Sequence, residues 1–207
     1  MGTKERRERE KQQLRDKILD AAREMFARDG YEAFTMRSLA HVIEYSPTAI
    51  YLHFKDKESL IAELCAADLA VLDATVKAIT EKVDDQIKRL KEAGLAFIKF
   101  GIEHPTQYQV VFVMPKPRDP TSTNDLLSQP YETSYASLRE GFLSAIDAGL
   151  LKREFDDPGL LAQVYFCGLH GIVSTRISAP DCLPKGWSPP LKQAELFIET
   201  FMKGLLK

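Results

Sequence analysis

Apolar residues in the first third of the chain recur every three or four positions, which is the spacing of an amphipathic helix. The stripe from Leu14 to Phe26 predicts a first helix that ends near Gly30, because glycine readily caps a helix C-terminus. Further along the chain the apolar spacing stays helical, and we find no convincing alternation of the kind typical of strands. The pattern predicts an all-α protein.

Polar residues mark where three more helices begin. Thr35 can cap a second helix, and Ser46 followed by Pro47 can begin a very short third one that runs through His53. Asp56 can cap a fourth, longer helix. The apolar positions of this fourth helix are Leu60, Ile61, Leu64, Leu69 and Leu72.

The remainder of the chain divides into longer helices. An apolar series over 87–102 ends at His104-Pro105, because a residue that precedes proline is biased away from helical geometry. Prolines and small polar residues predict a loop over 115–124. Further helices are expected over 126–148, 158–178 and 190–206.

The totals of the 207-residue chain are those of an ordinary globular protein, with 44% hydrophobic and 28% charged residues. No apolar run approaches the roughly 20 residues of a membrane span, and we expect a cytoplasmic protein without a membrane partner. The cysteines Cys65, Cys167 and Cys182 are too widely spaced for a CxxC metal pattern, and no disulfide framework is indicated. We expect no metal and no cofactor.

The charges are unevenly distributed although the formal net charge is only -2. Residues 4–17 carry seven basic and four acidic side chains, so that the positive excess lies at the front of the chain. Mixed charges of this kind are common on solvated helices, and on charge alone a DNA contact is not indicated.

Two short helices joined by a tight turn allow the N-terminus of the second to approach the floor of the DNA major groove. The residues 35–40 (TMRSLA) and 46–60 (SPTAIYLHFKDKESL) resemble the signature of TetR-type transcriptional regulators. The resemblance covers about residues 12–72. It implies a three-helix helix-turn-helix DNA-binding domain over 12–72, with its motif at about 35–54, and a helical ligand-binding and dimerisation domain over 73–207.

Eight residues of this segment are candidates for contacting DNA. Hydroxyl and amino groups can donate to phosphate oxygens, whereas proline, threonine, histidine and arginine can approach base edges. Tyr51 could instead be mainly a packing residue, and Thr35 and Ser46 could be caps only. The phosphate candidates are Thr35, Ser46, Tyr51 and Lys57, and the base candidates are Arg37, Pro47, Thr48 and His53.

Two residues depart from the pattern that the resemblance implies. Glu44 stands where these turns usually have a glycine, and Leu52 stands where a polar or aromatic residue is frequent. An acidic side chain beside a phosphate would also weaken binding by repulsion.

The second part of the chain resembles the TetR subclass that has a Trp-His-Gly motif in its C-terminal domain. The resemblance rests on His104-Pro105 with Tyr108 and Phe112, and on residues 166–171 (FCGLHG), with Leu169 in place of the tryptophan. A strip of small residues on this helix predicts a four-helix dimer interface with the last helix, although such a helix could equally pack inside its own subunit. The interface candidates are Gly168, Gly171, Thr175, Phe197 and Phe201.

A ligand pocket in this part should be mostly apolar with few polar groups. Aromatic residues at helical spacing more often belong to the hydrophobic core, so each pocket candidate could instead be a core residue. The candidates are Phe97, Phe100, Tyr108, Phe112, Phe142, Phe166 and His170.

These features together predict a homodimeric repressor that binds a palindromic DNA operator and is released from it by a small hydrophobic ligand. An enzyme is the first alternative, but the histidines at 41, 53, 104 and 170 lack metal-ligand spacing, and no Gly-rich phosphate loop is present. A helical adaptor that binds protein instead of DNA is the second, and salt dependence distinguishes it, because contacts to phosphate weaken steeply with salt.

Overall fold

The computed structural model describes residues 3–114, 129–178 and 182–207. Its elements are helical throughout these ranges, apart from an isolated antiparallel bridge between Leu151 and Leu206. The predicted all-α fold is therefore confirmed. The loop expected at 115–124 and the first residues of the helix expected from Leu126 lie outside the described residues.

The chain divides by packing into two compact units. The first comprises residues 1–68 with 109–130, and the second comprises 69–108 with 131–207. The helix α4 (Lys57–Lys82) contributes residues to both.

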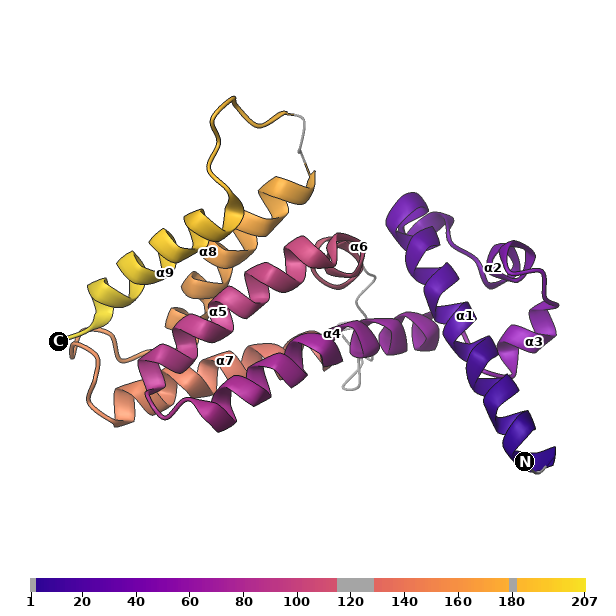
Figure 1. The fold of residues 1–207 in the computed structure, drawn as a ribbon, viewed down its shortest axis with the longest axis horizontal. Helices are drawn as coiled ribbons and strands as arrows, with labels where there is room; N and C mark the ends of the chain where they lie inside the picture. Colours follow the sequence, from indigo (N-terminus) through magenta and orange to yellow (C-terminus); the bar gives the residue numbers. More distant parts are fainter. Residues whose placement is uncertain (1–2, 115–128, 179–181) are drawn as a thin grey trace. The chain divides into compact units, whose positions relative to one another are not determined.

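The first unit contains α1 (Thr3–Ala33), α2 (Met36–Val42), α3 (Pro47–Tyr51), the beginning of α4 and the π-helical turn η1 (Gln109–Val113) (Figure 1). The expected break at Gly30 is present, since this residue has a φ of 79° inside α1. α2 ends at Val42, and α3 ends at Tyr51, slightly earlier than the expected His53. One apolar core joins the four helices: Ile18, Ala22, Met25, Phe26, Phe34, Leu39, Ile43, Ile50, Phe54, Leu60, Ile61 and Leu64.

A buried ion pair also joins α1 to α4 within this unit. The Asp68 carboxylate is only 1% exposed and accepts from both Nε and Nη2 of Arg23, at 3.0 and 2.7 Å. This paired geometry satisfies a charge that burial would otherwise disfavour. The pair fixes the register between α1 and the first turns of α4.

The second unit contains the rest of α4, then α5 (Gln86–Glu103), α6 (Pro105–Tyr108), α7 (Gln129–Asp147), α8 (Pro158–Ser178) and α9 (Pro190–Leu205). α5, α8 and α9 pack against one another (Figure 1). α5 ends before Pro105 as expected, but the chain resumes a helical course at once, because proline is tolerated at a first helical position.

Glycines allow the close helix crossings of this unit. A Cβ on Gly94 of α5 would lie 2.2 Å from the Tyr165 hydroxyl oxygen, and one on Gly168 of α8 would lie 2.1 Å from the Phe197 ring. Tyr165 donates across the first crossing to the carbonyl oxygen of Leu90 at 3.0 Å. Its burial raises the pKa of the phenol above the usual range.

Within the described ranges, none of the helices has both the length and the apolar character that crossing a membrane requires.

Candidate nucleic-acid interface

The first helix of the motif begins with a reciprocal cap. The Ser38 backbone N–H donates to Thr35 Oγ1 at 3.0 Å, and the Thr35 N–H donates to Ser38 Oγ at 3.2 Å. Such a capping box fixes the start of a helix. Thr35 remains exposed, as does Arg37 in the first turn. Capping and a phosphate contact are compatible here, since both use the same helix N-terminus.

The turn between α2 and α3 is formed without a glycine. Glu44 has a φ of 60°, in the left-handed region, and its N–H donates to the His41 carbonyl at 3.2 Å. The Tyr45 N–H donates to the Ala40 carbonyl at 3.0 Å. These two bonds are those of a Schellman cap, which normally has glycine at the left-handed position. The turn geometry that Glu44 put in question is thus present, with the acidic side chain exposed.

The short helix α3 turns its polar and small residues outward. Ser46 caps it by accepting from the Ala49 N–H at 3.2 Å, and Pro47 occupies the first helical position. Ile50 is fully buried, whereas Tyr51 is 53% exposed. Pro47 and Thr48 are exposed as well. The exposure of Tyr51 argues against a role mainly in packing.

An apolar side chain extends this outward face. Leu52 at the C-cap of α3 is 78% exposed, the largest value among the exposed large hydrophobic residues described. In the sequence, Leu52 stood out only as a departure from the family pattern, and its exposure could not be predicted. An outward leucine beside Thr48 and Tyr51 can make apolar contacts with whatever α3 faces.

Lys57 has intramolecular partners in place of an open position. Its Nζ lies 3.8 Å from the centroid of the Tyr31 ring and donates to the Tyr31 backbone carbonyl. A cation above an aromatic ring is stabilised by the negative face of that ring. The ammonium therefore ties the start of α4 to the end of α1, a contact over 26 residues that helical spacing did not indicate.

His53 is also half-buried, and it lies beside the basic residues of α1. Burial, followed by the charges of Lys11 and Arg15, lowers the pKa of its imidazole. Its buried Nδ1 has no hydrogen-bond partner among the described residues. Of the eight DNA candidates, the six at 35, 37, 46, 47, 48 and 51 are exposed, whereas His53 and Lys57 are turned partly inward.

Four of the predicted pocket residues form one aromatic cluster in the second unit. Phe97 makes edge contacts with Tyr108 and Phe166, in each case with 5.6 Å between ring centroids. The Tyr108 hydroxyl and His170 Nδ1 lie 2.6 Å apart in a hydrogen bond. Burial lowers the pKa of His170. The cluster is a packed core with a polar pair at its centre.

The other three pocket candidates lie elsewhere. Phe142 is fully buried against Tyr165 and Phe201, and Phe112 belongs to η1 in the first unit. Phe100 lines a cavity of about 400 Å³ between α4 and α5. Its lining residues are Val71, Leu72, Thr75, Ile79, Glu92, Leu95, Ala96, Lys99, Phe100, Glu103 and His104.

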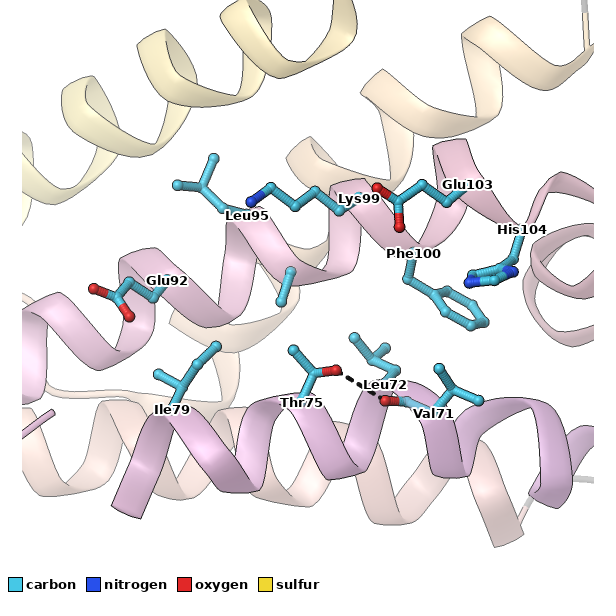
Figure 2. A pocket seen from close by; sticks show the side chains of 11 residues that line it. Val71, Leu72, Thr75, Ile79, Glu92, Leu95, Lys99, Phe100, Glu103 and His104 are labelled. Atoms are coloured by element: carbon cyan, nitrogen blue, oxygen red, sulfur yellow. Dashed lines mark hydrogen bonds between the residues drawn. The ribbon is translucent and has the colours of Figure 1, made fainter. Parts of the chain in front are cut away.

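Figure 2 shows how this cavity is built. Leu72 and Ile79 point from α4 toward α5, and Phe100 points back from α5 toward α4. The Thr75 hydroxyl donates to the Val71 carbonyl at 3.0 Å, so that its hydrogen-bonding capacity is partly used within α4. The lining of the cavity is apolar on the α4 side apart from Thr75, whereas α5 contributes both apolar and charged residues. Of the pocket candidates from the sequence, only Phe100 lines it, because the cavity requires the packing of two helices whose apolar stripes look like ordinary core.

The predicted interface residues of α8 fall into two groups. Gly168 faces Phe197 of the same chain, which gives both an intrachain role. Gly171 and Thr175 are exposed, and a Cβ on Gly171 would meet no atom within 4 Å. Exposed residues continue this line at helical spacing toward the start of α8: Leu160, Val164 and Cys167.

The first unit thus presents a capped helix, a tight turn and a second capped helix with an outward polar face. This arrangement is that of a helix-turn-helix, the motif whose second helix can enter the DNA major groove. Comparison with known proteins is more specific, because residues 18–64 match the family model described as "Bacterial regulatory proteins, tetR family". Over these residues the chain is therefore similar to the tetR family of bacterial regulatory proteins.

Two curated relatives align with the same region. Over 56 residues the chain is 45% identical to the HTH-type transcriptional repressor AcnR of Corynebacterium diphtheriae. Over 51 residues it is 43% identical to the HTH-type transcriptional regulator QacR of Staphylococcus aureus. The alignments cover 27% and 25% of this chain, and only 30% and 27% of the relatives' own length.

The likeness to solved structures extends over nearly the whole chain. The fatty acid degradation regulator FadR from Bacillus halodurans superposes with a TM-score of 0.75 at 18% identity, covering 92% of this chain and 95% of that one. The two-part helical fold is therefore shared, and at this identity the likeness concerns the fold alone.

Proposed function

We propose that this chain is a homodimeric transcriptional repressor that binds a palindromic operator in double-stranded DNA and is released by a small hydrophobic effector. The observation that carries the proposal is the outward face of α3, where Thr48 and Tyr51 are exposed beside the Ser46 cap. No folding requirement explains an exposed tyrosine on a five-residue helix, whereas a phosphate contact does.

Each exposed candidate then has a role in the complex. Thr35, Ser46 and Tyr51 donate to phosphate oxygens and fix the register of α3 in the major groove. Arg37 and Thr48 approach base edges, and Pro47 offers apolar contact. Lys57 and His53, with their inward positions, support the domain and contribute less directly than the sequence alone suggested.

Leu52 adds an apolar contact to this set. The C5-methyl group of thymine is the apolar feature of the major groove, and a leucine that is 78% exposed on the reading helix matches it. Replacing thymine by deoxyuridine at each operator position in turn removes only that methyl group. One substitution should weaken wild-type binding several-fold and leave the Leu52→Ala variant unaffected, and uniform insensitivity of the wild type would refute the contact.

The cavity between α4 and α5 is our proposed effector site. Its volume of about 400 Å³ falls in the range of small-molecule pockets, and more than half of its lining residues are apolar. We infer that Ala96→Phe fills it and abolishes the response to compounds that shift the melting temperature of the wild type, while DNA binding persists. The matched variant Ala136→Phe, on the exposed side of α7, should keep the response. Equal responses in both variants would place the effector elsewhere.

The remaining parts of the proposal concern the second half of the chain. Residues 12–72 form the DNA-binding domain and 73–207 the effector and dimerisation domain, which is related to the Trp-His-Gly subclass through 166–171. The exposed line that ends in Gly171 and Thr175 on α8 supports a dimer interface. The protein acts in the cytoplasm, as a regulator and not as an enzyme.

Retention of genomic DNA fragments by the purified protein tests the DNA-binding function. At two salt concentrations, we expect a small set of fragments to be retained, more weakly at higher salt. A Thr48→Ala, Tyr51→Phe variant removes two exposed hydroxyls without disturbing the core and should lose the enrichment, whereas the control Thr80→Ala on α4 should keep it. Retention that is equal for all three proteins would contradict the proposed reading face.

A further inference from the structure

The N-terminal turns of α1 carry a line of basic side chains on one side of the helix. Lys4, Arg7, Lys11 and Arg15 follow one another at spacings of three, four and four residues, which places them on a common helical face. The first three are exposed, and every residue over 4–13 is exposed as well. Core packing therefore does not explain these turns.

Contacts of Arg15 fix the direction in which this basic stripe faces. The Arg15 guanidinium lies 5.3 Å from the centroid of the Phe54 ring and forms an ion pair with Glu63. The positive charges of Lys11 and Arg15 also lower the pKa of His53, which follows α3 directly. The stripe thus faces the C-terminal end of α3 within the first unit. In Figure 1 these turns are the indigo end of α1, at the label N.

The acidic residues of the same turns do not neutralise this face. Glu10 is paired at 3.3 Å with Arg6, which lies on another side of the helix. Glu8 lies on the same face as the stripe, but the four basic residues there outnumber it, and a positive excess remains over residues 4–17. Positive side chains near a helix N-terminus are disfavoured by the helix dipole. Helix stability therefore does not account for Lys4 and Arg7 in this position.

The dimensions of the stripe match those of a DNA backbone. From Lys4 to Arg15 the helix rises about 16 Å, at about 1.5 Å per residue. Duplex DNA carries one negative charge per ~1.7 Å of its axis, so that several phosphates lie within this length.

We propose that Lys4, Arg7 and Lys11 bind backbone phosphates of duplex DNA next to the half-site that α3 reads. The inference rests on the proposed DNA-binding function and extends its contact surface beyond the helix-turn-helix. Phosphate contacts carry no sequence information, so that the stripe raises affinity and lengthens the protected duplex without changing the bases selected.

Two double variants of equal charge test the contact. Arg7→Gln with Lys11→Gln removes two positive charges from the stripe, and Arg6→Gln with Arg9→Gln removes two from other sides of the same turns. Glutamine keeps the helix propensity nearly constant. Affinity is measured against salt on two versions of a duplex retained by the wild type, one trimmed to the half-sites and one with about ten further base pairs on each side.

On the long duplex the stripe variant should lower the magnitude of the salt slope by about 2 per bound chain, since each phosphate contact contributes about 0.9. The control pair should change the slope far less, and on the trimmed duplex both variants should match the wild type. Equal effects of the two pairs, or a stripe effect that persists on the trimmed duplex, would overturn the inference. A wild type that binds no duplex at all would instead refute the proposed regulator itself.

Discussion

Replacing Glu44 by glycine should stabilise the first unit, although glycine is generally a destabilising residue. Glu44 occupies the left-handed position of the Schellman cap after α2, with a φ of 60°. An L-residue in this conformation costs about 1–2 kcal/mol, because Cβ approaches the neighbouring carbonyl oxygen. Glycine removes that cost and keeps the N–H that donates to His41.

The unfolded chain opposes part of this gain. Glycine has more conformations to lose on folding than another residue, which lowers stability by about 0.4–1 kcal/mol. The difference predicts a net gain of about 0.5–1 kcal/mol for Glu44→Gly. Urea denaturation measures it as a higher midpoint with an unchanged slope.

Glu44→Gln is the matched control, because it removes the charge and keeps Cβ. It should change the free energy of unfolding by less than about 0.5 kcal/mol, as surface substitutions usually do. If the glycine and glutamine variants were equally stable, or if glycine lowered the midpoint, backbone strain at Glu44 would be refuted. Both variants also remove a negative charge near the predicted phosphate contacts, so that any gain in DNA affinity should be common to them.

Three further substitutions test other parts of the structure. Arg23→Met removes the ion-pair partner of the buried Asp68 carboxylate and should lower the free energy of unfolding in urea by about 3 kcal/mol, whereas adding Asp68→Leu should restore most of it; an unaltered single variant would refute the pair. Asp56→Ala removes the cap of α4 and should lower thermal stability by about 1 kcal/mol near neutral pH. The hydrogen bond from Ser59 lowers the pKa of Asp56 in the folded state. The stability difference between wild type and Asp56→Ala should therefore be complete above the ordinary pKa of about 3.9 and vanish as the pH falls through the lowered pKa. A stability difference that does not change with pH would contradict this role of Asp56. Gly168→Ala places a Cβ against the Phe197 ring. The overpacking should cost about 2 kcal/mol and outweigh the gain of about 1 kcal/mol in helix propensity, so that the melting temperature should fall. An unchanged or higher melting temperature would contradict the close crossing of α8 and α9.

The helix-turn-helix could be predicted from the sequence because its signals are local. Thr35, Ser46 and Asp56 each accept from a backbone N–H three residues later, and a capping residue is recognisable without knowledge of the tertiary fold. The long helices α8 and α9 begin at prolines for a similar reason, since proline is tolerated at the first helical position.

Long-range contacts limited the prediction of individual side chains. From the sequence, Lys57 was a candidate donor to phosphate. In the structure its ammonium group contacts Tyr31, a residue far away in sequence. Gly168 resembled part of a surface for a second subunit, but its open side is filled by Phe197. Helical spacing shows which residues share a face, and it does not show what that face meets.

The cavity illustrates the same limit for a binding site. The aromatic residues chosen from the sequence include Phe97 and Tyr108, whose rings fill one another's space. The open volume lies instead between α4 and α5, where small side chains such as Ala96 face across to α4. A cavity forms where side chains do not fill the space between two helices, and the spacing of apolar residues in a sequence does not show how completely that space is filled.

Selection of bound duplexes from a random-sequence pool tests the central claim most directly, namely that α3 reads DNA in a two-fold symmetric dimer. We predict enrichment of an inverted repeat whose half-site centres lie about 10–10.5 base pairs apart or a multiple of that, and loss of this repeat in the Thr48→Ala, Tyr51→Phe variant. Failure to enrich any sequence, or enrichment of the same sequence by the variant, would contradict the account.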